Sequence, residues 1–454
     1  MSARVLPLAA GATFLAMLDA TVTNLAFPDL QRDLTGSTVS GLTWIVTLYA
    51  VAFAALLAPA GRLADLVGVR RLYRAGVGVF TLASLACALA PDLPVLLAAR
   101  ALQGAGAAAM VPASLAVLLH GTPPERRARA IGLWRASAAV AAAVGPSLGG
   151  VLVDAFGWRS LFFINLPLGL ALLWAARALA PRHGEGRLPD LAGTVLLAGG
   201  LGAIALAVSQ GEDLTRLDPL VLAALLGGIA AVAVALVRSA RHPVPVLEIS
   251  LWRDRAFAVT NAVSFFYGAA FFPWMLAGVL VLTRMWGYSE LEAGLAMTPG
   301  ALAAAAASVL MGRLATPRAA MLTGALAMLA AAVWTWLALP EEPRFLAFWL
   351  PCGLLVGAGM GALATGTAGS AALSVAPARF AGATGLNTTA RQLGGALGTA
   401  VLAALLAGPR TGPETFTTVY ACCAAACALA LLAGLVLRTA APSVSARTAE
   451  GVPA

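Results

Sequence analysis

The sequence contains no lysine and few charged residues of any kind. Charged residues make up 11% of the 454 residues, and hydrophobic residues make up 60%. A soluble protein of ordinary composition has about 25% charged residues. The phosphate-binding loop of ATP-driven machines needs a lysine, so nothing here supports ATP as the energy source. The composition predicts a polytopic membrane protein.

Metal-ligating and disulfide-forming residues are also scarce. The five cysteines lie in apolar runs and the three histidines lie in loops, without the spacing of a metal site or an extracellular disulfide pattern. The net charge of +9 is spread over short loops, which argues against nucleic acid as a partner. We therefore expect no metal, no cofactor, no nucleic-acid partner and no enzymatic activity.

Apolar runs of about 20 residues predict helices that span a membrane. We expect an all-α polytopic fold with fourteen transmembrane helices and a retained first helix in place of a cleaved signal peptide. The predicted spans are 7–28, 42–60, 72–91, 94–119, 130–152, 160–180, 190–210, 217–238, 257–282, 292–312, 318–339, 344–370, 383–408 and 414–438.

The arginines are distributed unevenly between the two sides of these spans. With the N-terminus inside, 20 of the 29 arginines lie in cytoplasmic segments, six lie on the opposite side and three lie within spans. Positively charged loops of membrane proteins stay in the cytoplasm. We expect a multi-pass protein of the cytoplasmic (inner) membrane with both termini in the cytoplasm.

Short glycine motifs occur twice in the chain at nearly one offset. Gly61 begins a Gly-Arg-Leu-Ala motif that returns at Gly312, and a Gly-Leu pair at Gly132 returns at Gly385. This repetition predicts two duplicated six-helix halves with two helices inserted between them. The predicted parts are 1–185 (first half), 186–240 (inserted helices), 241–440 (second half) and 441–454 (disordered cytoplasmic tail).

Asp19 is the acidic residue that lies most clearly inside a predicted span. A carboxylate at membrane depth costs about 2.5–3.5 kcal/mol even on insertion scales that give low values, so its side chain should face protein or water. The functional interpretation is a proton site or a site for a cationic substrate. The structural alternative is an aspartate hydrogen-bonded by Thr23, one helical turn further on.

Arg100 and Gln103 lie in the fourth span, at a depth that overlaps that of Asp19. Because arginine keeps its proton, Arg100 would adjust the protonation of a carboxylate and position water. Alternatively, it extends toward the membrane surface. On the second span, Trp44 and Tyr49 could offer aromatic faces to a lipophilic cation, although interfacial anchoring explains Trp44 equally well.

A second polar group lies in the thirteenth span. Asn387, Arg391 and Gln392 interrupt an apolar run there. They could line the central cavity or brace an inner gate, and the sequence favours neither. Arg135, in the fifth span, is shallower and could extend to the surface.

Two glycine-containing segments have features of conformational elements. The first runs from Gly61 to Arg71, where glycines suggest tight turns and Asp65 could cap or pair near a neighbouring helix end, as a latch on the cytoplasmic side. Gly68, Arg70 and Arg71 belong to it, and the two arginines would face the anionic leaflet. The second ends the fifth span, where small residues allow close helix packing and a proline permits a kink; its candidates are Gly145, Pro146, Gly149 and Gly150.

Taken in order, these motifs resemble those of the major facilitator superfamily, specifically its fourteen-helix drug:proton antiporter branch (EmrB/QacA type). The match covers most of residues 7–438. Arg135 departs from it, because the branch usually has a small residue there. The matching segments are Leu18–Pro28 including Asn24, Gly61–Arg71, Arg100–Gly104, Gly145–Gly150, Trp158–Gly169 and Gly382–Gly398.

The resemblance implies a major facilitator fold that works by alternating access. It implies efflux of a small lipophilic drug or antibiotic, with a lipophilic cation as one candidate, driven by the proton motive force. Asp19 would take up the proton, and the protein would act as a monomer in membrane lipid. Export of a neutral or anionic metabolite is the alternative that Arg135 and Arg391 favour. A transport-inactive receptor is disfavoured because no sizeable soluble domain is predicted.

Overall fold

The computed structural model describes residues 5–23, 27–33, 39–179, 190–209, 218–406 and 413–437. All regular structure in these ranges is helical. Eleven of the described helices are long and apolar enough to cross a membrane, or twelve when the bent helix α6 is included. Within the described residues, each of the fourteen predicted spans overlaps helical structure. Helix α4 and the shorter α9 are not among the eleven or twelve, so the count of fourteen crossing helices stays a prediction.

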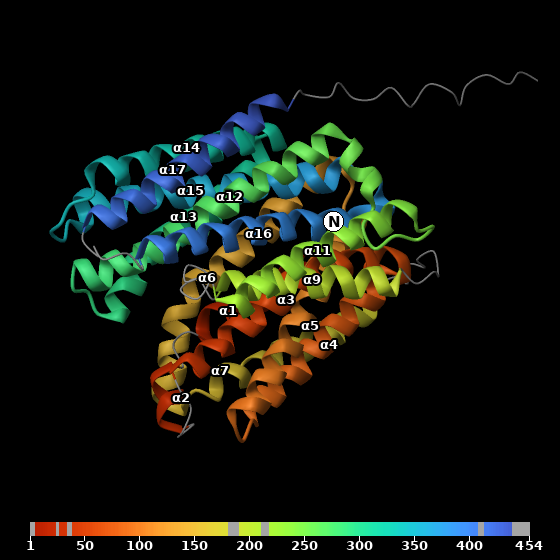
Figure 1. Cartoon of the computed structure of the whole chain (residues 1–454), viewed down its shortest axis with the longest axis horizontal. Coiled ribbons are helices and arrows are strands. Elements are labelled where there is room, and N and C mark those ends of the chain that lie inside the picture. Colours follow the sequence, from red (N-terminus) through yellow and green to blue (C-terminus); the bar gives the residue numbers. More distant parts are fainter. Residues whose placement is uncertain are drawn as a thin grey trace, which may run out of the picture.

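The helices form two bundles (Figure 1). Within each bundle, neighbouring helices pack along their length. The N-terminal bundle contains α1 (Val5–Val22), the short α2 (Phe27–Asp33), α3 (Val39–Val67), α4 (Val69–Ala88), α5 (Leu93–His120), α6 (Arg127–Phe156), α7 (Ser160–Phe163) and α8 (Asn165–Ala175). The C-terminal bundle contains α12 (Arg255–Leu280), α13 (Glu290–Leu314), α14 (Pro317–Ala338), α15 (Leu350–Leu373), α16 (Phe380–Leu406) and α17 (Pro413–Val436).

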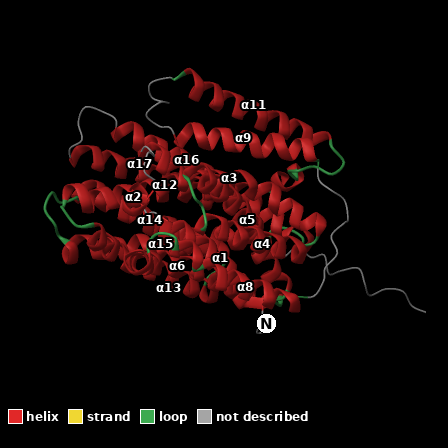
Figure 2. Ribbon diagram, turned by 90° about the horizontal axis from the view of Figure 1, so that it is seen from below, coloured by secondary structure: helices red, strands yellow, loops and turns green. Residues whose placement is uncertain are grey.

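Two further helices, α9 (Leu191–Ser209) and α11 (Pro219–Arg241), lie side by side at the edge of the molecule (Figure 2). They approach closely because Gly200 and Gly228 face each other: a Cβ on either glycine would lie 2.8 Å from the other's carbonyl oxygen. An ion pair between Asp190 and Arg238 joins their ends. The hydrogen bond from Arg238 lowers the pKa of Asp190 below its ordinary value. Helix α9 also packs on α3 of the N-terminal bundle.

The two bundles contact each other mainly through two helix pairs, α6 with α13 and α3 with α16. Each pair is built on repeated glycines. A Cβ on Gly385 would lie 3.3 Å from the Cα of Gly61, and a Cβ on Gly132 would lie 3.0 Å from the Cα of Gly312. The residues of the sequence repeat therefore occupy matching places in the two contacts, which is the arrangement expected from duplicated halves.

Both contacts lie toward the end of the molecule where α3 ends and α16 begins, here called the Asp65 end. The loops at the opposite ends of the two bundles diverge (Figure 1). The prediction that glycines form tight turns between Gly61 and Arg71 is wrong for Gly61 and confirmed for Gly68. Helix α3 continues to Val67, and the chain turns only at Gly68, whose positive φ of 105° favours glycine. Gly61 lies inside the helix, where a Cβ would be 2.5 Å from the Ala381 carbonyl oxygen.

Candidate functional site

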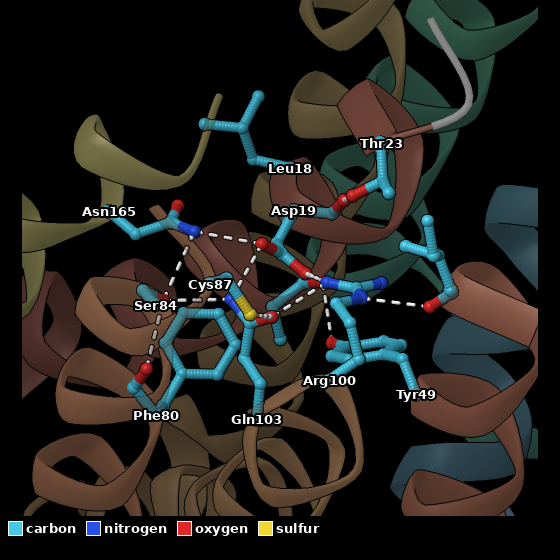
Figure 3. A network of polar contacts seen from close by, with 12 residues as sticks. Leu18, Asp19, Thr23, Tyr49, Phe80, Ser84, Cys87, Arg100, Gln103 and Asn165 are labelled. Atoms are coloured by element: carbon cyan, nitrogen blue, oxygen red, sulfur yellow. Dashed lines mark hydrogen bonds and ion pairs between the residues drawn. The ribbon is translucent and has the colours of Figure 1, made fainter. Parts of the chain in front are cut away.

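Asp19 lies in the middle of a hydrogen-bonded network inside the N-terminal bundle (Figure 3). Its side chain has no solvent exposure. Its Oδ2 accepts a hydrogen bond from Arg100 Nη1 at 2.6 Å. Its Oδ1 accepts from Gln103 Nε2 at 2.7 Å and from Asn165 Nδ2 at 2.8 Å. Three donors, one of them charged, thus hydrogen-bond the buried carboxylate.

Arg100 is the counter-charge and is also fully buried. Its Nε donates to the Ile45 carbonyl oxygen of α3 at 2.9 Å, and its Nη1 also donates to Gln103 Oε1 at 2.7 Å. The guanidinium carbon lies 4.4 Å from the ring centroid of Tyr49. Tyr49 thus offers its aromatic face to a cation, and that cation is Arg100. The Nη2 atom of Arg100 finds no hydrogen-bond partner among the residues that the structure describes.

Ser84 connects the two amide side chains of the network. Its hydroxyl oxygen accepts from Gln103 Nε2 at 2.7 Å and from Asn165 Nδ2 at 3.3 Å, while it donates to the Phe80 carbonyl oxygen. The Oδ1 of Asn165 is buried, and no described residue donates a hydrogen bond to it. The network therefore joins α1, α3, α4, α5 and α8 around a single ion pair. In the described part of the chain, its unpaired acceptor is Asn165 Oδ1 and its unpaired donor is Arg100 Nη2.

Local sequence explains how these side chains meet. Arg100 and Gln103 are three residues apart on α5, so both lie on the helix face that meets α1. Gly104 follows directly, and a Cβ there would lie 2.4 Å from the Tyr49 carbonyl oxygen. The absence of a side chain at Gly104 lets α3 approach α5 closely enough for Ile45 and Tyr49 to contact the Arg100 guanidinium.

Two members of the network, Ser84 and Asn165, were not predicted as site residues. Both are buried polar residues within apolar runs. That is the signal that could have marked them, but it does not say which helices they face. Thr23 donates to the backbone carbonyl oxygen of Asp19 at 2.7 Å, so it does not hydrogen-bond the carboxylate. Asn24 lies outside the described residues.

Trp44 is not part of the network. It is half-buried on α3, one residue before Ile45. Among the described residues, no hydrogen bond or ring contact joins it to Asp19 or Arg100.

Asp65, in the predicted conformational segment Gly61–Arg71, is hydrogen-bonded by backbone amides and, among the described residues, by no side chain. Its Oδ2 accepts from the Gly382 backbone amide at 2.7 Å, and its Oδ1 accepts from the Ala381 amide at 3.2 Å. These amides belong to the first turn of α16, where the helix dipole favours an anion. A carboxylate of the N-terminal bundle thus caps a helix of the C-terminal bundle, and this contact is here called the latch.

Charged groups next to the latch join the same two bundles. Glu248 pairs with Arg62 of α3 at 3.5 Å and with Arg379, just before α16, at 3.1 Å. Arg70 donates to the Arg177 carbonyl oxygen at 3.0 Å, and Arg71 is exposed. The ion pairs connect both bundles to the segment that follows α11.

Helix α6 bends by 46° between Pro124–Gly145 and Ser147–Phe156. The bend falls at Pro146, which cannot donate a helical hydrogen bond. A Cβ on Gly145 would lie 2.2 Å from the Thr21 hydroxyl oxygen, so α6 and α1 touch beside the bend. Gly149 is buried, whereas Gly150 faces open space.

The polar residues of α16 do not contact the Asp19 network in this arrangement. Asn387 donates to the Ser264 hydroxyl of α12 at 2.7 Å. Arg391 interacts with Tyr267 of α12 and with Arg135 of α6. In the described part of the chain, no group of three or more His, Cys, Asp or Glu side chains could hold a metal ion.

The predicted family is supported by comparison with known proteins. The model of the Major Facilitator Superfamily matches residues 9–278. A methylenomycin A resistance protein of Streptomyces coelicolor is 38% identical over 63% of this chain and 60% of its own length. The multidrug resistance protein Stp of Mycobacterium tuberculosis is 36% identical over 66% of this chain and 56% of its own length. The chain thus spans less than two thirds of the length of these two relatives.

For two other proteins, the similarity to this chain extends over more of the other protein's length. The cephamycin export protein CmcT of Amycolatopsis lactamdurans is 35% identical over 86% of this chain and 82% of its own. The human organic anion transporter MFSD10 has a similar fold, with a TM-score of 0.67 at 16% identity over 95% of this chain and 98% of its own. The family model and the two-bundle fold agree: this multi-pass membrane protein belongs to the major facilitator superfamily.

Proposed function

We propose that this protein is a proton-coupled efflux antiporter that exports small lipophilic molecules across the cytoplasmic membrane by alternating access. The observation that carries the proposal is the Asp19–Arg100 pair, which is fully buried and, with Gln103 and Asn165, joins side chains of α1, α5 and α8. A carboxylate in such a place is a functional candidate because its protonation changes every contact that it makes. The names of the relatives, which include resistance and export proteins, support efflux.

The proposed proton step takes place on the Asp19 carboxylate. A proton added to Asp19 removes the negative charge that Arg100 faces, and Arg100 keeps its own charge because a guanidinium group does not give up its proton in proteins. The spare Oδ1 of Asn165 offers an acceptor for the new hydroxyl once the amide rotates. Arg100, left without its anion, favours an arrangement in which water or another anion reaches it.

The proposed route from Asp19 to the bundle interface is α1 itself. Thr21, two residues beyond Asp19, packs on Gly145 beside the bend of α6. Helix α6 in turn packs on α13 of the C-terminal bundle. A tilt of α1 that follows protonation would therefore move the part of α6 that contacts the other bundle, and this movement would change access between the bundles.

The arginine distribution favours a cytoplasmic location for the Asp65 end. With that orientation, contact between the bundles at the Asp65 end closes the cytoplasmic side, and the latch stabilises this outward-facing arrangement. Substrate would enter when the latch is broken and leave when it has formed again.

A second candidate concerns substrate charge. Arg135 and Arg391 bring two positive charges to the bundle interface, and these charges favour an anionic substrate over a lipophilic cation. No comparable observation favours a receptor without transport activity.

Everted membrane vesicles that contain the protein and a pH-sensitive dye test the proposal. After the vesicles have been energised, addition of a transported substrate is expected to release protons from the lumen, and Asp19→Asn is expected to abolish this release. Full proton release in Asp19→Asn would overturn the role of Asp19. Substrate export without proton movement would overturn coupling altogether.

A further inference from the structure

Arg135 and Arg391 come from different bundles, and both interact electrostatically with Tyr267 of α12. Arg135 lies on α6 of the N-terminal bundle and Arg391 on α16 of the C-terminal bundle, and the two guanidinium groups interact electrostatically. Both side chains are half-buried, and the Nε atom of each is buried without a hydrogen-bond partner in the described part of the chain. Among the described residues, no ion pair joins either arginine to a carboxylate.

The surroundings of the arginine pair are aromatic and apolar. The Arg135 guanidinium carbon lies 4.7 Å from the ring centroid of Trp134, and Tyr267 of α12 lies beside Arg391. One and four residues along α6 from Arg135, Ala136 and Ala139 pack in an apolar cluster with residues of α13. A ligand at this place would therefore meet two positive charges next to an apolar wall.

Two like charges without a counter-ion are an unfavourable arrangement inside a membrane protein. Neither arginine can relieve it by losing a proton, because guanidinium stays charged in proteins. Burial of unpaired polar atoms adds a further cost. A carboxylate placed between the two groups would neutralise their repulsion and accept hydrogen bonds from both, with the planar, bidentate geometry that arginine prefers.

We propose that the Arg135–Arg391 pair binds the carboxylate group of an amphiphilic organic anion, whose apolar body lies against the apolar cluster of α6 and α13. This assignment rests on the proposed function and gives its substrate class. It also assigns separate tasks to the charged groups: Asp19 is fully occupied by Arg100, Gln103 and Asn165 and handles the proton, whereas the arginine pair handles the substrate. Because one arginine comes from each bundle, binding of the carboxylate to both would depend on the distance between the two bundles.

Binding of three probes that share one apolar body tests the proposal on the purified full chain in detergent. The probes are 4-phenylbutyrate, its neutral amide and 4-phenylbutylammonium, and binding is measured by calorimetry without any proton gradient. We expect the carboxylate to bind at least about tenfold more tightly than the amide, the size expected when charge-assisted hydrogen bonds are added. Arg135→Gln and Arg391→Gln should each remove most of that preference.

Arg129→Gln is the matched control, because Arg129 is an exposed arginine on the same helix as Arg135. It removes the same charge and should keep the preference. Arg391→Lys keeps the positive charge and should lie between the parent and Arg391→Gln. If a glutamine variant does not fold, the three probes on the unaltered chain still decide the charge preference.

Equal affinity for the three probes, preference for the ammonium compound, or no carboxylate binding at about 10 mM would overturn the proposal. A carboxylate preference that survives in both glutamine variants would also overturn it. Asp19→Asn separates this test from that of the proposed function: it should lose proton-coupled transport and keep the carboxylate preference.

Discussion

The carboxylates of Asp19 and Asp65 belong to the same bundle but have opposite kinds of partners. Asp19 is bound by side chains of its own bundle, including a buried arginine, and has no solvent exposure. Asp65 is bound by two backbone amides that belong to the other bundle. Protonation of Asp19 would change the internal charge balance of one bundle, whereas loss of the Asp65 contact would change the equilibrium between two arrangements of the bundles. The comparison separates a residue suited to proton chemistry from one suited to conformational control.

The largest effect should come from Asp19→Asn. This change keeps the size of the side chain but removes the titrating group, so gradient-driven transport in proteoliposomes should fall at least about 100-fold, the range found when an acid–base group is removed. Substrate counterflow without a gradient should persist, because it needs conformational exchange but no proton. Counterflow and gradient-driven transport that fall together would mean that Asp19 is only structural.

Asp65→Asn should have a smaller effect of a different kind. Hydrogen bonds to a charged group contribute about 1.5–3 kcal/mol each, so weakening the latch should raise the population in which the Asp65 end is open about tenfold or more. The opening is measured with Ser308→Cys in a variant whose five native cysteines have been replaced by alanine. Ser308 is buried at the α6–α13 contact, so the rate at which the introduced thiol is labelled rises when the Asp65 end opens. The control is Thr316→Val. Thr316 occupies the position in the second half that corresponds to Asp65 in the first, but it caps the N-terminus of α14 within its own bundle, and among the described residues no hydrogen bond joins it to the other bundle. Equal labelling of the two variants would contradict a special role for Asp65.

Asn165→Ala should weaken transport more mildly. It removes one of the three donors on the Asp19 carboxylate and leaves Arg100 and Gln103 in place. We expect gradient-driven transport to fall about fivefold, equivalent to about 1 kcal/mol, the typical worth of one hydrogen bond. Ser84→Ala, which removes a member of the network that does not contact the carboxylate, should have less effect. A larger effect for Ser84→Ala would contradict the network as described.

The smallest effect should come from Asp190, which pairs with Arg238 at the α9–α11 edge, away from both carboxylates. The hydrogen bond from Arg238 lowers the pKa of Asp190, so the pair contributes stability above the ordinary aspartate pKa of about 3.9 and loses it as the pH falls through the lower folded value. Asp190→Asn should lower the unfolding temperature at pH 7 by about 2 °C or less. The parent and the variant should converge in acid, and Arg238→Gln should add nothing to Asp190→Asn. A constant difference from pH 7 into acid would exclude the ion pair as its cause.

Much of the fold could be predicted because membrane burial imposes simple rules on sequence. Apolar runs located the helices, and the repeated glycines predicted duplicated halves. That these glycines lie in the α3–α16 and α6–α13 contacts is a finding of the structure. The positions at which the helices end were harder to predict. Helix α3 continues through the segment predicted to turn, because Gly61 allows close packing against α16 and does not form a turn. A single sequence does not distinguish these two uses of glycine.

The candidate site was predictable to the extent that charge at membrane depth is rare. Asp19 and Arg100 stood out for that reason, and their similar depths made contact feasible. Ser84 and Asn165 did not stand out, because small polar side chains are common in membrane helices and their partners depend on helix rotation. The meeting of Arg135 with Arg391 depends on how the two bundles face each other, which spacing along one chain does not specify.

The central claim is that Asp19 carries the coupled proton, and infrared difference spectroscopy of the purified protein tests it most directly. On a pH change from alkaline to acid, the account predicts a carbonyl stretching band of a newly protonated carboxylic acid that is present in the parent and in Asp65→Asn and is missing in Asp19→Asn. An unchanged band in Asp19→Asn would place the proton on another group and contradict the account.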